Sequence, residues 1–121
     1  MSKRILVVED QVDNRQILRD LLNSVGYQIL EAEDGARGVA AAEAERPDLI
    51  LMDIQLPLID GYEATRRIKA NPALRAIPII VVTSYALSGD DVKAFAAGCD
   101  AYVTKPFSPR ALLAKVREYL P

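Results

Sequence analysis

Histidine is absent from this chain of 121 residues, and cysteine occurs only once, at Cys99. Without histidine, every Ser–His and Cys–His mechanism of nucleophilic catalysis is excluded, and the chain cannot itself carry a phosphohistidine. With one cysteine, the chain can form neither an intramolecular disulfide nor a cysteine-rich zinc site. The chemistry of this protein must therefore rest on carboxylates, hydroxyls, amides and cationic side chains.

Long apolar runs and a strong excess of one charge are also missing. No stretch reaches the ~18 consecutive apolar residues of a membrane-spanning helix, and residues 1–4 lead straight into a strand-like run rather than a signal peptide. The 15 basic and 17 acidic residues give a net charge of −2, which provides no general attraction to nucleic acid or to an anionic membrane. We therefore expect a cytoplasmic protein that binds neither nucleic acid nor membranes.

Short apolar runs alternate along the chain with amphipathic stretches of helical periodicity. The composition, 50% hydrophobic and 26% charged, is that of an ordinary globular domain and not of a disordered chain. Asp13 is the expected N-cap of the first helix. The apolar runs predict strands at 5–8, 27–31, 49–52, 79–82 and 101–103. The periodic stretches predict helices at 13–25, 34–45, 62–70, 90–97 and 109–120.

Five successive strand–helix units predict a parallel sheet. The runs at 5–8, 49–52 and 79–82 have no polar alternation, so helices should cover both faces of the sheet. Polar residues in the run at 27–31 suit an edge strand. The expected fold class is a small doubly wound α/β domain that spans residues 1–121, without a linker, internal repeat or second domain.

Polar side chains follow the predicted strands where each one ends. Because the carboxyl ends of parallel strands form the ligand crevice of such sheets, we expect these side chains to meet. Carboxylates packed together repel unless a cation sits among them, and oxygen ligands favour Mg²⁺. An Asp carboxylate can attack phosphorus to give an aspartyl phosphate, so the pattern predicts a site for magnesium and a phosphoryl group. The residues are Glu9, Asp10, Asp53, Thr83 and Lys105.

Each of these residues also has an ordinary explanation when taken alone. Asp10 would usually be a turn or cap residue, Thr83 a turn residue, and Lys105 a solvated surface charge. Asp53 is harder to explain in this way, because it follows four consecutive apolar residues. The coincidence of all these residues at the ends of different strands favours the functional interpretation.

The chain resembles the receiver domain of two-component response regulators, the CheY-like superfamily, over essentially its whole length. Each matching motif is weak alone, but together they are specific because they occur in order and at similar spacing. The motifs are Ile5–Asp10, Asp48–Asp53, Pro57 with Gly61, Val82–Ser84 and Tyr102–Pro106. The resemblance implies a flavodoxin-like three-layer sandwich whose parallel five-stranded sheet has the order 2-1-3-4-5.

The resemblance also implies a role for each of the acidic residues and for two of their neighbours. Asp53 would be the phosphoacceptor. Mg²⁺ would be bound by Asp10, Asp53 and the backbone carbonyl of Gln55, with Glu9 acting through a water molecule. Gln55 and Tyr85 would tune the lifetime of the phosphoryl group, although Tyr85 fits equally well as a surface aromatic.

The remaining motif residues would respond to the phosphoryl group. Lys105 would contact it, Thr83 would be the switch hydroxyl, and Tyr102 would change rotamer with Thr83. The Lys105–Pro106 bond would be a cis peptide, which only a bond to proline permits at low cost. These assignments follow from the resemblance alone.

The partners implied by the resemblance are proteins. A histidine kinase or histidine phosphotransfer protein would donate the phosphoryl group at the helix 13–25, and a downstream target would contact the surface formed by 90–97, 101–103 and 109–120. The segment 52–69 looks most like stand-alone regulators of the DivK type, which steer bacterial cell division and polarity, and like receivers of hybrid histidine kinases. We expect a monomer without an output domain that catalyses at most its own phosphorylation and dephosphorylation.

Several alternatives stay open. The chain could be a receiver cut from a hybrid histidine kinase or a longer regulator, or a receiver-like binding module that is never phosphorylated. Modules of that kind usually lack an acid, the acceptor or the lysine, and this chain has all three. A phosphatase of the haloacid dehalogenase type needs a second Asp two residues after its nucleophile, where this chain has Gln55.

Overall fold

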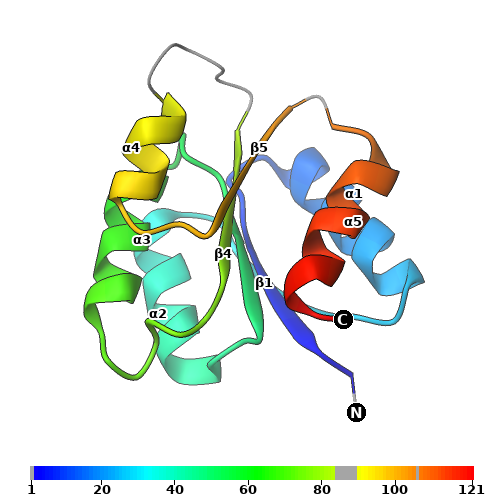
Figure 1. Cartoon of the computed structure of the whole chain (residues 1–121), viewed down its shortest axis with the longest axis horizontal. Helices are drawn as coiled ribbons and strands as arrows, with labels where there is room; N and C mark the ends of the chain where they lie inside the picture. Colours follow the sequence, from blue (N-terminus) through cyan, green and yellow to red (C-terminus); the bar gives the residue numbers. More distant parts are fainter. Residues whose placement is uncertain (1, 84–89, 106) are drawn as a thin grey trace.

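The protein alternates strands and helices along the chain (Figure 1). The computed structural model describes residues 2–83, 90–105 and 107–121. Within these ranges, no helix combines the length and apolar character needed to cross a membrane. The strands are β1 (Arg4–Val8), β2 (Gln28–Ala32), β3 (Leu49–Met52), β4 (Ile79–Thr83) and β5 (Ala101–Thr104). The helices are α1 (Val12–Ser24), α2 (Gly35–Glu45), α3 (Gly61–Ala70), α4 (Asp90–Ala96) and α5 (Pro109–Tyr119).

All strand pairs in the sheet are parallel, and the strand order is β2-β1-β3-β4-β5. The predicted order is therefore confirmed. β1, β3 and β4 lie inside the sheet, as their uninterrupted apolar runs predicted, and every residue of β3 and β4 is buried. β2 lies at an edge, where the exposed Gln28 and Glu31 meet solvent. The polarity of this strand correctly indicated its place.

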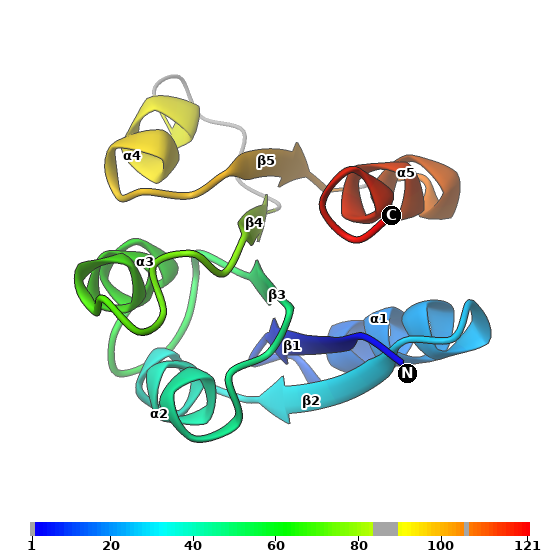
Figure 2. The same cartoon turned by 60° about the horizontal axis from the view of Figure 1, so that its bottom comes forward.

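Helices cover both faces of the sheet, as Figure 2 shows from the side. Successive residues of β1 point to opposite faces: Ile5 packs with α1 and α5, and Leu6 packs with α2, α3 and α4. Both residues are fully buried. The doubly wound three-layer fold is therefore confirmed, with an apolar core on each side of the sheet.

The start of α1 differs from the prediction. The helix begins at Val12 with Gln11 as its N-cap, and Gln11 makes no side-chain cap hydrogen bond. Asp13 is not the N-cap but lies in the first helical turn. Its negative charge there still stabilises the helix, because it lies near the positive end of the helix dipole. The prediction was wrong because Gln11 is already the last extended residue, and its carbonyl accepts the first hydrogen bond of the helix from the Arg15 N–H, so Asp13 lies inside α1. Among the described residues, the side chains that cap helices are those of Asp34, Asp60 and Ser108.

Gly61 allows α3 to begin close against the end of β3. Its N–H donates to the carbonyl of Ile54 at 2.8 Å. A Cβ atom at this position would overlap with the carbonyl oxygen of Asp53, so a larger residue cannot fit without moving the backbone. Gly61 thus closes the loop after β3 directly over the residue that the sequence singled out as the phosphoacceptor.

Candidate functional site

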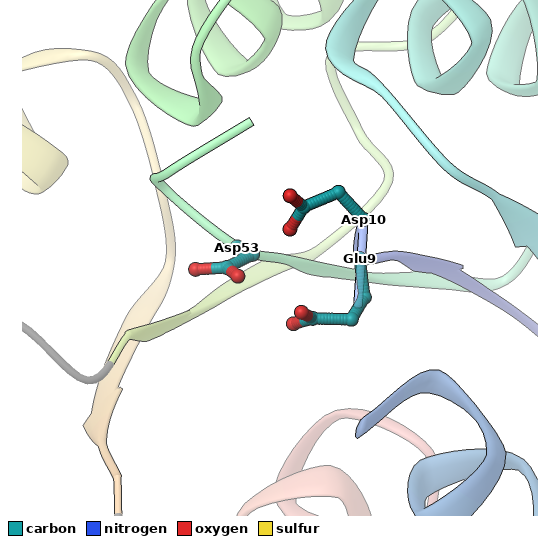
Figure 3. Close-up of side chains that lie close together, drawn as sticks. All are labelled: Glu9, Asp10 and Asp53. Atoms are coloured by element: carbon teal, nitrogen blue, oxygen red, sulfur yellow. The ribbon is translucent and has the colours of Figure 1, made fainter. Parts of the chain in front are cut away.

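Three carboxylates meet at the carboxyl edge of the sheet (Figure 3). Glu9 and Asp10 follow β1, and Asp53 follows β3, which pairs with β1. One carboxylate oxygen from each residue lies within 4.8 Å of the other two. Glu9 is 1% exposed and Asp53 is 8% exposed, whereas Asp10 is half-buried. The structure therefore brings together the three acidic residues that the strand ends predicted.

Lys105 places an ammonium group beside this acidic cluster. Its Nζ lies 3.0 Å from Glu9 Oε2 and 3.7 Å from Asp53 Oδ2. The lysine backbone N–H donates to the carbonyl of Thr83, the fully buried last residue of β4, at 2.6 Å. Residues from the ends of β1, β3, β4 and β5 thus converge. One ammonium cannot balance three carboxylates, so the ionised cluster keeps an excess of negative charge.

The environment of Asp53 makes its ionisation unfavourable. Burial, followed by a side-chain hydrogen bond and charge repulsion from Glu9, raises the pKa of Asp53, and the net value is about 7. Lys105 and the N–H of Ile54, which donates to Asp53 Oδ1 at 2.7 Å, oppose this rise. A bound cation would favour the ionised form that a nucleophilic carboxylate requires.

This raised pKa predicts a pH-dependent effect of Asp53→Asn on stability. Because the folded state binds the Asp53 proton more tightly than the unfolded state, stability falls as pH rises from the ordinary pKa towards about 7, and stays reduced above that pH. At about pH 8 without divalent cations, Asp53→Asn should raise the free energy of unfolding by roughly 1–3 kcal/mol. Urea denaturation at about pH 5 and pH 8 measures the effect.

The control for this measurement is Asp20→Asn, which removes an exposed carboxylate. The Asp20 variant should change the free energy of unfolding by less than about 0.5 kcal/mol at either pH. A gain for Asp53→Asn that is no larger at pH 8 than at pH 5 would contradict the raised pKa.

The donor set fits a hard divalent cation. It consists of oxygen atoms only, carries excess negative charge and is partly open to solvent through Asp10. Both oxygens of Glu9 already accept protein hydrogen bonds, Oε1 from the Gln11 N–H at 3.2 Å and Oε2 from Lys105. Asp10 and Asp53 are therefore better placed than Glu9 to bind a cation directly.

The structure describes only some of the other predicted site residues. Gln55 is exposed and lies in the loop after β3, and its backbone carbonyl as a metal ligand stays a prediction. Tyr102 is half-buried in β5, against the core beneath α2, α3 and α4. Tyr85 and Pro106 lie outside the described residues. The tuning role of Tyr85 and the cis Lys105–Pro106 peptide therefore stay predictions.

Sequence reasoning missed two residues next to the cluster. Arg15 Nη1 donates to the backbone carbonyl of Glu9 at 2.8 Å, and Arg15 Nε donates to Glu31 Oε1 at 3.1 Å. In the sequence both charges look like ordinary solvated residues of a helix and an edge strand. No local pattern reveals their contact, because it depends on α1 packing beside β2.

Comparison with known proteins gives consistent matches. The sequence matches the response regulator receiver domain over residues 5–117. It is 40% identical to the polar-differentiation response regulator DivK of Brucella anthropi, over 99% of this chain and 98% of that protein. The receiver domain of the sensor histidine kinase PA1611 from Pseudomonas aeruginosa PAO1 is 39% identical, with a TM-score of 0.92. The match covers 99% of this chain and 98% of that one, and that structure was solved with a magnesium ion coordinated in its active site cleft. A putative response regulator from Chloroflexus aurantiacus is 28% identical with a TM-score of 0.95, at the same coverage.

Proposed function

The chain belongs to the response regulator receiver family, and on that premise we propose that Asp53 accepts a phosphoryl group from a phosphohistidine on a partner protein. The observation that carries this proposal is the position of Asp53. Its carboxylate is buried at the end of a central strand, within 4.8 Å of two other carboxylates and 3.7 Å from Lys105. This arrangement combines a nucleophilic oxygen with groups that can neutralise phosphoryl charge.

In the proposed transfer, an Asp53 oxygen attacks the phosphorus atom of the phosphohistidine. The new P–O bond forms as the P–N bond breaks, and the imidazole leaves with the electron pair and takes up a proton from solvent. Lys105 would then turn from Glu9 and Asp53 towards the phosphoryl oxygens, where its charge offsets theirs. Thr83, at the end of the neighbouring strand, would donate its hydroxyl hydrogen to a phosphoryl oxygen.

We assign the divalent cation as Mg²⁺. Asp10, Asp53 and the backbone carbonyl of Gln55 would hold it, with Glu9 acting through water. When bound, the ion neutralises charge on the phosphoryl oxygens. The oxygen-only donor set supports this choice, as does the magnesium ion in the active site cleft of the PA1611 receiver domain.

Acetyl phosphate provides a direct test that needs no partner protein. With Mg²⁺ present, intact mass should increase by about 80 Da, the mass of one phosphoryl group. With EDTA in place of Mg²⁺, the increase should be lost. Peptide mapping should place the label on the peptide that contains Asp53. An unmodified mass, which a receiver-like binding module would give, or a label on another peptide would refute the proposal.

The surface beside the cluster supports a docking site for the phosphohistidine donor. Val12 and Ile17 of α1 are 63% and 59% exposed. A groove of about 570 Å³, lined by Ile17, Leu21, Lys105 and Phe107 among others, runs between α1 and the start of α5. Because Lys105 belongs both to this groove and to the acidic cluster, an apolar helix face docked here would lie next to Asp53.

The switch residues connect the site to a second surface. We propose that Thr83 moves towards the phosphoryl group and Tyr102 turns inward, which changes the surface of α4, β5 and α5 for a downstream protein target. Val92 and Phe95 of α4 are 67% and 50% exposed, so this surface offers apolar side chains to a partner.

The matched family is a signalling family. We propose that the chain catalyses nothing beyond its own phosphorylation and dephosphorylation, because Gln55 occupies the position where a phosphatase of the haloacid dehalogenase type needs an acid. The similarity to DivK and to a histidine kinase receiver supports two candidate settings for this chain: a response regulator of the DivK type and the receiver domain of a histidine kinase. A single receiver domain over 1–121, a monomeric state and a cytoplasmic location stay predictions.

A further inference from the structure

Arg15 connects α1, β2 and the end of β1 around the acidic cluster. We propose that Arg15, held by Glu31, is a positioning residue that fixes the turn from Glu9 to Gln11 and thereby presents the Asp10 carboxylate to Mg²⁺. This inference rests on the proposed function, because it assigns a role towards the cation of that same site. It goes further in naming a residue that touches neither the cation nor the phosphoryl group.

The backbone of Glu9 is held from two sides. Its N–H donates to the carbonyl of Ala32 on β2 at 3.0 Å, and its carbonyl accepts from Arg15 Nη1 at 2.8 Å. Because Glu9 is only 1% exposed, a backbone carbonyl there needs a protein partner. A bond to a charged donor is among the stronger hydrogen bonds, so Arg15 restrains this peptide unit firmly.

Arg15 also holds the other side of Asp10. Its backbone N–H donates to the carbonyl of Gln11 at 2.9 Å. This is the ordinary first backbone hydrogen bond of α1, which any residue at this position makes, so the restraint that is specific to the Arg15 side chain is its bond to the Glu9 carbonyl. The N-cap Gln11 makes no side-chain cap hydrogen bond. The start of α1 is tied to the end of β1 by the Arg15 side chain, which donates to the Glu9 carbonyl, and by the Glu9 carboxylate, which accepts from the Gln11 N–H at 3.2 Å.

Glu31 orients the Arg15 guanidinium by accepting from its Nε, while the Nη1 of the same guanidinium donates to the Glu9 carbonyl. The two carboxylate oxygens of Glu31 accept from Arg15 at 3.1 Å and from Arg19 Nη1 at 3.2 Å. The Arg15 side chain is 16% exposed, against 38% for Arg19. Arg19 carries the same charge on the same helix and pairs with the same Glu31, but it lies one turn beyond Arg15. It is therefore a matched control for Arg15.

Positioning and simple electrostatics predict opposite results. If Arg15 acted only through its charge, removing it would strengthen the binding of a divalent cation at the neighbouring carboxylates. If Arg15 positions the Glu9–Gln11 turn, removing it loosens the ligand geometry and weakens binding. Replacement of residues that orient metal ligands typically weakens metal binding at least roughly tenfold.

Isothermal titration calorimetry with MgCl₂ distinguishes the two explanations on the full chain. Arg15→Met should raise the Kd for Mg²⁺ roughly tenfold. Arg15→Lys keeps the charge but offers one donor nitrogen in place of the separate Nε and Nη1 that Arg15 uses, so its Kd should lie between those of the wild type and Arg15→Met. Arg19→Met should bind Mg²⁺ as tightly as the wild type or slightly more tightly. Circular dichroism of each variant checks that the fold is retained.

The outcomes separate this inference from the proposed function. Wild-type protein that binds no Mg²⁺ would overturn the assigned cation and the Arg15 inference together. Wild-type binding with an unchanged or tighter Kd for Arg15→Met would overturn the inference alone. The same loss in Arg15→Met and Arg19→Met would also overturn it, because a general effect on α1 or Glu31 would then explain the result.

Discussion

Replacing Asp53 with Asn is expected to abolish phosphoryl uptake from acetyl phosphate, with a fall in rate of at least roughly 100-fold. The amide has nearly the same shape as the carboxylate but carries no negative charge and is a poor nucleophile towards phosphorus. Glu9 and Asp10 remain in the variant, so the test asks whether one particular carboxylate of the cluster is the acceptor. Intact mass against time, in the presence of Mg²⁺, measures the rate.

We expect this variant to lose uptake while remaining folded, which urea denaturation checks. The raised pKa of Asp53 predicts that the Asn variant is more stable than the wild type near pH 8. The exposed Asp20 offers a control, because Asp20→Asn removes a carboxylate outside the cluster and should take up the phosphoryl group at the wild-type rate. Uptake by Asp53→Asn at more than a tenth of the wild-type rate would sink the assignment of Asp53 as acceptor.

Replacing Lys105 with Met is expected to have the largest effect on stability. Glu9 is 1% exposed and has the Lys105 ammonium at 3.0 Å, so the variant leaves a buried carboxylate without its cation. Breaking such a pair should lower the free energy of unfolding by about 3 kcal/mol at about pH 8 without divalent cations. Saturating Mg²⁺ should reduce the loss, because it supplies positive charge to the same cluster.

Lys115 provides the matched control for this variant. Its ammonium lies 3.3 Å from the Glu118 carboxylate, but the two side chains are 36% and 58% exposed. Lys115→Met should therefore change the free energy of unfolding by less than about 1 kcal/mol in urea denaturation. Equal losses for the two lysine variants would show that the Lys105 pair behaves as an ordinary surface ion pair.

Most of the fold could be predicted from local patterns of apolar residues. Uninterrupted runs at β3 and β4 indicated strands covered on both faces, and polar residues in β2 indicated an edge. Each observed helix and strand begins and ends within one residue of its prediction. Such patterns succeed because a helix that buries one face must repeat apolar residues with the helical period, whereas a strand covered on both faces must be apolar throughout.

The candidate site was predictable for a different reason. Glu9, Asp53 and Lys105 each follow a strand, and in a parallel sheet the ends of neighbouring strands lie together. Topology therefore turns positions that are distant in the sequence into one cluster. The N-cap of α1 failed as a prediction, because the preference of Asp for that position is only a local tendency, and the helix begins where the Gln11 carbonyl accepts its first backbone hydrogen bond.

By itself, the sequence determined the elements, their layers and the gathering of acidic residues at one edge, because these follow from local periodicity and from parallel strand geometry. Only the tertiary structure decided which charges touch. The ion pair between Lys105 and Glu9, the raised pKa of Asp53 and the bonds from Arg15 to Glu9 and Glu31 all depend on distances of a few ångströms across separate elements. The periodicity of apolar residues in the sequence cannot predict such distances, because the direction and burial of side chains are set only when the helices and the sheet pack together.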